Sequence, residues 1–105
     1  MVTQQEIVDA ARSLAAVASS PATVILFGSH ARGDAVGDSD VDFLVIEDEL
    51  SDQIEEYVRL RKAILGLGSA VDILVVSREH AESRRDIPGS VIRAAFKEGK
   101  VVAER

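Results

Sequence analysis

Two short groups of residues in the first half of the chain have the types and the spacing to bind a nucleotide and a metal ion. Gly28 and Ser29 follow an apolar run and begin a stretch of small and polar residues. A Gly-Ser turn in this position can direct backbone N–H groups toward a phosphate. Ten residues separate Ser29 from Asp40, and Asp42 follows two positions later. On a strand, this i and i+2 spacing projects both carboxylates from one face onto a shared divalent cation. The first hypothesis is therefore a site for a nucleotide and Mg²⁺.

The spacing of this pattern makes a chance match rare. Gly-Ser, ten residues and Asp-x-Asp fix four positions, and average residue usage gives such a match by chance with a probability on the order of one in a thousand in a chain of this size. The pattern also lies between two apolar runs, residues 23–27 and 41–46. Both runs have the length and composition of buried strands.

Asp72 is a third candidate ligand, because it is the one charged residue in the apolar run 71–76. Burying a carboxylate without a partner costs several kcal/mol, so we expect a partner or a metal ion to compensate it. If the strands 41–46 and 71–76 are neighbours, Asp72 lies beside Asp40 and Asp42, and three carboxylates surround one or two Mg²⁺ ions. The alternative is that Asp72 only starts its strand and faces solvent.

The charge of the chain is strongly acidic and unevenly distributed. There are 12 Lys and Arg residues against 18 Asp and Glu residues, for a net charge of −6. Between Gly33 and Val58 there are ten acids and no base. Such a segment repels a nucleic-acid backbone and attracts cations or a basic protein surface, so we expect no direct binding of nucleic acid. A solvated acidic face is the alternative explanation.

The composition also excludes several classes of chemistry. The chain has no Cys and only two His, which excludes thiolate catalysis and Cys/His metal clusters. Its first residues lack the basic and apolar pattern of a leader, and no apolar run approaches the ~18–20 residues that span a bilayer. We therefore expect a cytoplasmic protein without membrane contact. A chain of 105 residues can bury its own core, so residues 1–105 are predicted to form a single domain.

Helices and strands are predicted to alternate along the chain. Thr3 and Glu6 have the spacing of a capping box and begin a helix over residues 3–18. The three apolar runs are the strands, and residues 29–39 form a short helical turn followed by a loop. Ser51 is predicted to cap a helix that ends at Gly66 and Gly68, and Ser77 to cap a short helix. Pro88 is predicted to start a last helix that ends at Gly99, and residues 101–103 to form an edge strand. This order indicates an α/β or α+β domain in which helices cover a small sheet.

Two groups of apolar residues lie on the predicted helices. The helix after Ser51 carries an apolar stripe of Ile54, Tyr57, Val58, Ile64 and Leu65. Val91, Phe96 and Val101 near the end of the chain are either part of the core or a surface for a partner. His30, beside the glycine turn, either contacts a nucleotide or is a solvated loop residue.

The sequence Gly28-Ser29, ten residues, Asp40-Val41-Asp42, with a later strand that bears Asp72, resembles the nucleotidyltransferase superfamily that shares the palm of DNA polymerase β. The local form Phe-Gly-Ser-His-Ala-Arg-Gly at residues 27–33 looks most like the minimal nucleotidyltransferases, which are antitoxin partners of small helical HEPN ribonucleases. The motifs cover residues 24–76, and the two ends match only in general character.

This resemblance implies a polymerase β palm-like fold, a small mixed sheet flanked by helices. It also implies a set of site residues. Asp40, Asp42 and Asp72 are the expected Mg²⁺ ligands, and Asp72 helps to deprotonate the attacking hydroxyl. Gly28 and Ser29 hold the triphosphate of ATP. Arg32 is the expected contact to phosphate, where its guanidinium neutralises charge on the leaving group.

The function that follows from the resemblance is transfer of AMP from ATP to a protein hydroxyl, with release of pyrophosphate. The expected acceptor is a Tyr of a HEPN-type toxin that forms a hetero-oligomer with this chain and is silenced by the modification. Two alternatives stay open. In the first, the chain is a non-catalytic antitoxin that neutralises its partner by binding; in the second, it is a small-molecule nucleotidyltransferase whose pocket another subunit completes.

Overall fold

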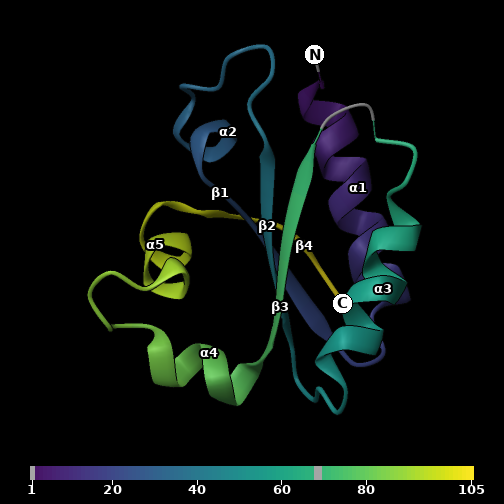
Figure 1. Cartoon of the computed structure of the whole chain (residues 1–105), viewed down its shortest axis with the longest axis vertical. Helices are drawn as coiled ribbons and strands as arrows, with labels where there is room; N and C mark the ends of the chain where they lie inside the picture. Colours follow the sequence, from purple (N-terminus) through teal and green to yellow (C-terminus); the bar gives the residue numbers. More distant parts are fainter. Residues whose placement is uncertain (1, 68–69) are drawn as a thin grey trace.

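The computed structural model describes residues 2–67 and 70–105 (Figure 1). The strands are β1 (Ala22–Phe27), β2 (Val41–Glu47), β3 (Val71–Ser77) and β4 (Lys100–Glu104). The helices are α1 (Gln4–Val17), α2 (Ser29–Arg32), α3 (Gln53–Ala63), α4 (Arg78–Arg84) and α5 (Val91–Glu98). None of these described helices is both long and apolar enough to cross a membrane.

The strands form one mixed sheet in the order β3-β2-β1-β4. β1 pairs antiparallel with both β2 and β4, whereas β2 and β3 run parallel. The register places Phe27 opposite Asp42, and Asp42 opposite Asp72. The end of β1 and the beginnings of β2 and β3 therefore meet at one end of the sheet. The predicted mixed sheet with flanking helices is confirmed.

The two faces of the sheet carry separate apolar cores. On one face, Phe43 and Val45 pack with buried residues of α1 and α3. On the other face, Leu44 and Ile46 pack with α4 and α5. Figure 1 shows α1 and α3 together on one side of the sheet and α2, α4 and α5 on the other. Because side chains alternate along a strand, Asp42 belongs to the face that carries α4 and α5.

Two of the predicted helix starts are confirmed by their hydrogen bonds. In α1 the backbone N–H of Glu6 donates to Thr3 Oγ1 at 3.1 Å, and the backbone N–H of Thr3 donates to Glu6 Oε1 at 3.0 Å. In α4 the backbone N–H of His80 donates to the Ser77 hydroxyl at 3.1 Å. The edge strand β4 and the stop of α5 at Gly99 also follow the prediction.

Two other predicted starts are wrong, the first by one residue and the second by three. Asp52, not Ser51, caps α3, because the Asp52 carboxylate accepts the backbone N–H of Glu55 at 3.0 Å. Pro88 lies before the last helix, which begins only after the cap at Ser90. Between them Gly89 adopts a φ of +82°, a left-handed conformation that interrupts the helix. The predicted helix end at Gly68 lies outside the described residues.

The predicted apolar stripe of α3 does not pack against the sheet. Ile54 and Leu65 are 79% and 76% exposed, and only Ile64 of the stripe is buried. Near the end of the chain, Val91 and Val101 are also exposed rather than part of the core. The nearby Phe96 is partly buried, and the guanidinium of Arg85 lies over its ring, 4.6 Å from the centroid.

The buried side of α3 carries a glutamate that meets a second glutamate from the end of β2. Glu56 Oε2 and Oε1 accept the backbone N–H and the hydroxyl of Ser19 at 2.9 and 2.8 Å. Burial, with the neighbouring Glu56, raises the pKa of the fully buried Glu47 to about 8. Burial also acts to raise the pKa of Glu56, but hydrogen bonds from Glu47 and Ser19 outweigh it and lower this pKa. At neutral pH Glu47 therefore holds the proton and Glu56 the charge.

The neutral state of Glu47 also explains how the second oxygen of its side chain can be buried without a hydrogen bond. Glu47 Oε2 is buried without a hydrogen-bond partner among the described residues. A neutral carboxyl group tolerates such a position better than a carboxylate does, because less solvation free energy is lost.

The proton on Glu47 predicts how the stability of the protein depends on pH. The pKa of Glu47 in the folded protein lies above its ordinary value of 4.5. The contribution of the Glu47 proton to the free energy of unfolding is therefore complete below pH 4.5 and is lost as the pH rises to about 8. Glu47→Gln removes this titration. We expect the free energy of unfolding of the wild type to fall relative to Glu47→Gln between about pH 5 and about pH 9, by at most about 1.4 kcal/mol per pH unit.

Urea unfolding followed by circular dichroism at several pH values measures this difference. Glu79→Gln, at an exposed position of α4, is the matched control and should follow the wild type. Parallel pH curves for the wild type and Glu47→Gln would contradict the assignment of the proton.

Candidate functional site

The turn at the end of β1 has a backbone conformation that only glycine adopts readily. Gly28 has φ +77° and ψ −157°, and it is the cap of α2. A Cβ atom on Gly28 would overlap the Oδ2 atom of Asp42. The absence of a side chain at Gly28 therefore lets the Asp42 carboxylate lie directly against the turn.

The short helix α2 supplies backbone groups beside this carboxylate. The first N–H groups of a helix have no carbonyl partner within the helix, so those that follow Gly28 can serve a phosphate. The helix ends at Gly33, which has φ +84°, and the Ser29 carbonyl accepts the backbone N–H groups of Gly33 and Asp34 at 3.0 and 3.1 Å. Ser29 thus lies in a compact turn next to Asp42.

The three predicted metal ligands gather at the same end of the sheet. Asp42 and Asp72 lie opposite each other on β2 and β3, and Asp40 stands two residues before Asp42. Partial burial of Asp42 raises its pKa, and the negative charges of Asp72 and then Asp40 raise it further. His30 acts in the opposite direction. The carboxylates are therefore close enough to repel one another.

Asp72 differs from its prediction in one respect, because it is exposed rather than buried. β3 is the outermost strand of the sheet, so the side chain at this position is open to solvent. The argument from the desolvation of a buried Asp72 is therefore wrong. The two strands are neighbours as expected, and their parallel pairing places Asp72 opposite Asp42.

The donor set at this end of the sheet fits Mg²⁺. None of the described Lys or Arg residues forms an ion pair with Asp40, Asp42 or Asp72. Within residues 2–67 and 70–105, no group of three or more His, Cys, Asp or Glu side chains is placed to hold a metal ion. Mg²⁺ is commonly held by one or two carboxylates together with the phosphates of a substrate. The residues thus fit an ion that arrives with a nucleotide.

His30 joins α2 to the loop that leads into the carboxylates. It is half-buried, and its Nε2 lies 3.3 Å from the carbonyl oxygen of Ser39, the residue before Asp40. The sequence left open whether His30 is a nucleotide contact or a loop residue. In the structure, the contact of His30 with Ser39 also positions the loop before Asp40. The local sequence gave no signal for this role, because Ser39 is nine residues away from His30.

Arg32 stands at the end of α2 with two acidic partners. Its Nε lies 3.2 Å from Asp34 Oδ2, and its Nη1 lies 3.1 Å from Glu98 Oε1 in α5. The side chain is 45% exposed, so the guanidinium can exchange these carboxylates for a phosphate. Its predicted contact to phosphate stays a prediction.

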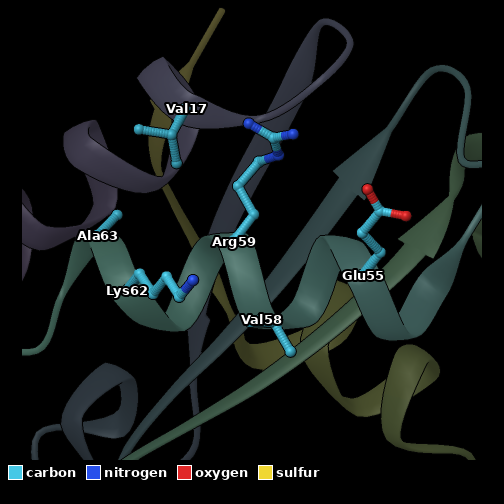
Figure 2. A pocket seen from close by; sticks show the side chains of 6 residues that line it. All are labelled: Val17, Glu55, Val58, Arg59, Lys62 and Ala63. Carbon is cyan, nitrogen blue, oxygen red and sulfur yellow. The ribbon is translucent and has the colours of Figure 1, made fainter.

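A cavity of about 660 Å³ lies elsewhere on the molecule. Figure 2 shows it beside α3, with Glu55, Val58, Arg59, Lys62 and Ala63 along the helix and Val17 at the end of α1. Its lining belongs to the helices on the face of the sheet opposite to Asp42. The cavity includes none of the predicted site residues, so the candidate site at the turn and the carboxylates is separate from it.

The close approach of Gly28 and Asp42 can be tested with a matched pair of substitutions. In Gly28→Ala, the alanine must adopt a positive φ and its Cβ also overlaps the Asp42 carboxylate. In Gly33→Ala, the alanine must adopt a positive φ, but nothing lies within 4 Å of its Cβ. We expect Gly33→Ala to cost about 1–2 kcal/mol of stability and Gly28→Ala to cost more. Chemical unfolding measures both. Equal losses would show that Asp42 does not need the space over Gly28.

Three comparisons place the chain among known proteins. The family model described as the nucleotidyltransferase domain matches residues 5–102. A protein of Methanocaldococcus jannaschii named "putative protein adenylyltransferase" is 34% identical over 79 residues, which cover 75% of each protein. A chain in a crystal structure of a toxin-antitoxin with AMP-PNP shares the fold, with a TM-score of 0.60 and 19% identity over 99% of this chain and 75% of that chain.

The match to the family model extends over almost the whole chain and includes every predicted site residue. It confirms the predicted nucleotidyltransferase fold and the predicted enzyme class, and the two other proteins agree with the resemblance drawn from the motifs. The chain therefore belongs to the nucleotidyltransferase domain family.

Proposed function

We propose that the protein transfers AMP from ATP to a hydroxyl group of another protein in a Mg²⁺-dependent reaction. The observation that carries this proposal is the position of Asp42, which lies opposite Asp72 and directly against the turn at Gly28. A set of carboxylates thus adjoins a turn suited to phosphate. The name of the Methanocaldococcus jannaschii relative supports a protein as the acceptor.

Each residue of the site has a role in this reaction. Asp40, Asp42 and Asp72 hold Mg²⁺, which, when bound, offsets the charge of the triphosphate and makes the acceptor hydroxyl more acidic. The backbone of Gly28 and Ser29 binds the triphosphate, which orients the α-phosphorus toward the acceptor.

The transfer itself is a displacement at the α-phosphorus. The acceptor oxygen forms a bond to phosphorus as the bond to the pyrophosphate oxygen breaks. Asp72, which is exposed at the edge of the sheet, receives the proton of the acceptor hydroxyl. Arg32 leaves Asp34 and Glu98 and stabilises the charge that develops on pyrophosphate.

The proposed acceptor is a tyrosine of a HEPN-type ribonuclease toxin, and the protein is its antitoxin. The motif at residues 27–33 supports this partner, as does the shared fold with a chain from a toxin-antitoxin structure. Adding AMP to the toxin places a charged group on it and blocks its activity. The toxin and this chain form a hetero-oligomer in the cytoplasm.

A binding-only antitoxin is the second candidate function. The observation that favours it is that the described carboxylates do not form a complete metal site by themselves. In that case the protein neutralises the toxin by contact, and a nucleotide only orders the site.

The proposal predicts that the mass of the partner protein depends on the carboxylates. With ATP and Mg²⁺, the wild-type chain should raise the mass of its co-purified partner by whole AMP units. Asp42→Asn and Asp72→Asn should slow this step by at least roughly 100-fold, because each loses a charged metal ligand. Asp38→Asn, in the exposed loop before the site, should leave the rate unchanged. Intact-mass spectrometry measures each rate.

The same variants separate the two candidate functions. An unmodified partner with the wild-type chain, combined with full protection from toxicity by Asp42→Asn in cells, would establish the binding-only antitoxin. Circular dichroism of each variant shows whether a lost activity reflects a lost fold.

A further inference from the structure

The helix α3 buries a charged residue and exposes its apolar residues. Glu56 is only 5% exposed, whereas Ile54 and Leu65, just beyond the helix end, are 79% and 76% exposed. Val58 is 45% exposed and Tyr57 is 40% exposed. Exposed apolar groups that gather on one side of a helix mark a surface that another protein covers.

Polar contacts hold α3 in this orientation. Glu56 accepts two hydrogen bonds from Ser19 and lies against Glu47, as described above. At the other end of the helix, Arg61 Nη1 donates to the carbonyl of Val71 at 2.5 Å. These contacts hold both ends of α3, so the apolar residues stay on the outer side.

The outer face of α3 is defined here as Ile54, Tyr57, Val58 and Leu65, and it adjoins the cavity of Figure 2 through Val58, which lines that cavity. Ile54 and Val58 are four residues apart on α3, so their side chains form a ridge along one side of the helix, and the exposed Leu65 lies just beyond the helix end. The cavity of about 660 Å³ runs next to this ridge and has the apolar side chains of Val17, Val58 and Ala63 in its lining. A ridge beside a groove is the shape that packs against another helix.

The charges on α3 complement those of a second copy of the same helix. Glu55 lies in its first turn and Lys62 in its last turn, seven residues apart and therefore on the same flank. Both line the cavity. In an antiparallel pair of helices related by a two-fold axis, Glu55 of each copy meets Lys62 of the other, and Ile54 meets Leu65.

We propose that two copies of this chain associate through the outer face of α3 in an antiparallel, two-fold contact. α3 covers the face of the sheet opposite to Asp42 (Figure 1), so the contact leaves the carboxylate end of each copy open. The contact does not depend on the proposed transfer of AMP, and its tests measure assembly alone. Because a single helix provides the ridge, we expect a reversible dimer with a dissociation constant in the micromolar range.

Two charge reversals test the antiparallel geometry. Glu55→Lys places two lysines at each end of the contact, and Lys62→Glu places two glutamates there. Each variant alone should dimerise at least roughly 10-fold more weakly than the wild type. An equimolar mixture of the two variants restores opposite charges at both ends, and it should dimerise to within about 3-fold of the wild type. Sedimentation velocity at low salt measures all four samples, since salt screens exposed charges.

A further substitution tests the apolar ridge. Val58→Glu places two like charges near the two-fold axis and should make the protein monomeric at every concentration measured. Val91→Glu is the matched control, because Val91 is a 53% exposed valine on a helix of the other face, and it should leave dimerisation unchanged. Circular dichroism verifies that both variants are folded.

Three results would overturn the proposal. The first is a wild-type chain that is monomeric up to about 500 µM, which would leave the outer face of α3 to a different protein. The second is a dimer that Val58→Glu does not weaken. The third is a mixture of the two charge variants that remains monomeric although each variant is folded.

Discussion

The site depends on the close approach of the Asp42 carboxylate to the backbone of Gly28. Antiparallel pairing of β1 and β2 places Phe27 opposite Asp42, so the next residue of the chain lies beside the carboxylate. A side chain at Gly28 would occupy the place of the Asp42 oxygen. The turn, the start of α2 and the parallel strand that carries Asp72 are all arranged around this contact.

β2 carries an acid near each end, and the protein accommodates the two in different ways. Asp42 lies at one end of the sheet, where partial burial and the neighbouring carboxylates raise its pKa. Glu47 lies at the other end and on the other face, fully buried, where a proton neutralises it. One acid is thus available for metal chemistry, and the other holds a helix in place.

The two faces of the sheet therefore serve different purposes. The face with α4 and α5 carries Asp42 and the turn at Gly28 that lies against it. The face with α1 and α3 carries the Glu47–Glu56 pair and, outside it, the apolar outer face of α3. Since a strand exposes alternate residues to opposite faces, a seven-residue strand such as β2 can support both functions without conflict between them.

Local patterns in the sequence determined most of the helices and strands and the positions of the candidate site residues. The capping box at Thr3 and Glu6, the three apolar strands and the Gly-Ser turn are each encoded within a few residues, so they could be predicted. Only the tertiary structure decided that Asp72 is exposed, because this depends on β3 being the outermost strand. It also decided which side of α3 faces the sheet. Helical spacing shows which residues share a side, but the contact that orients α3 joins Glu56 to Ser19, 37 residues away.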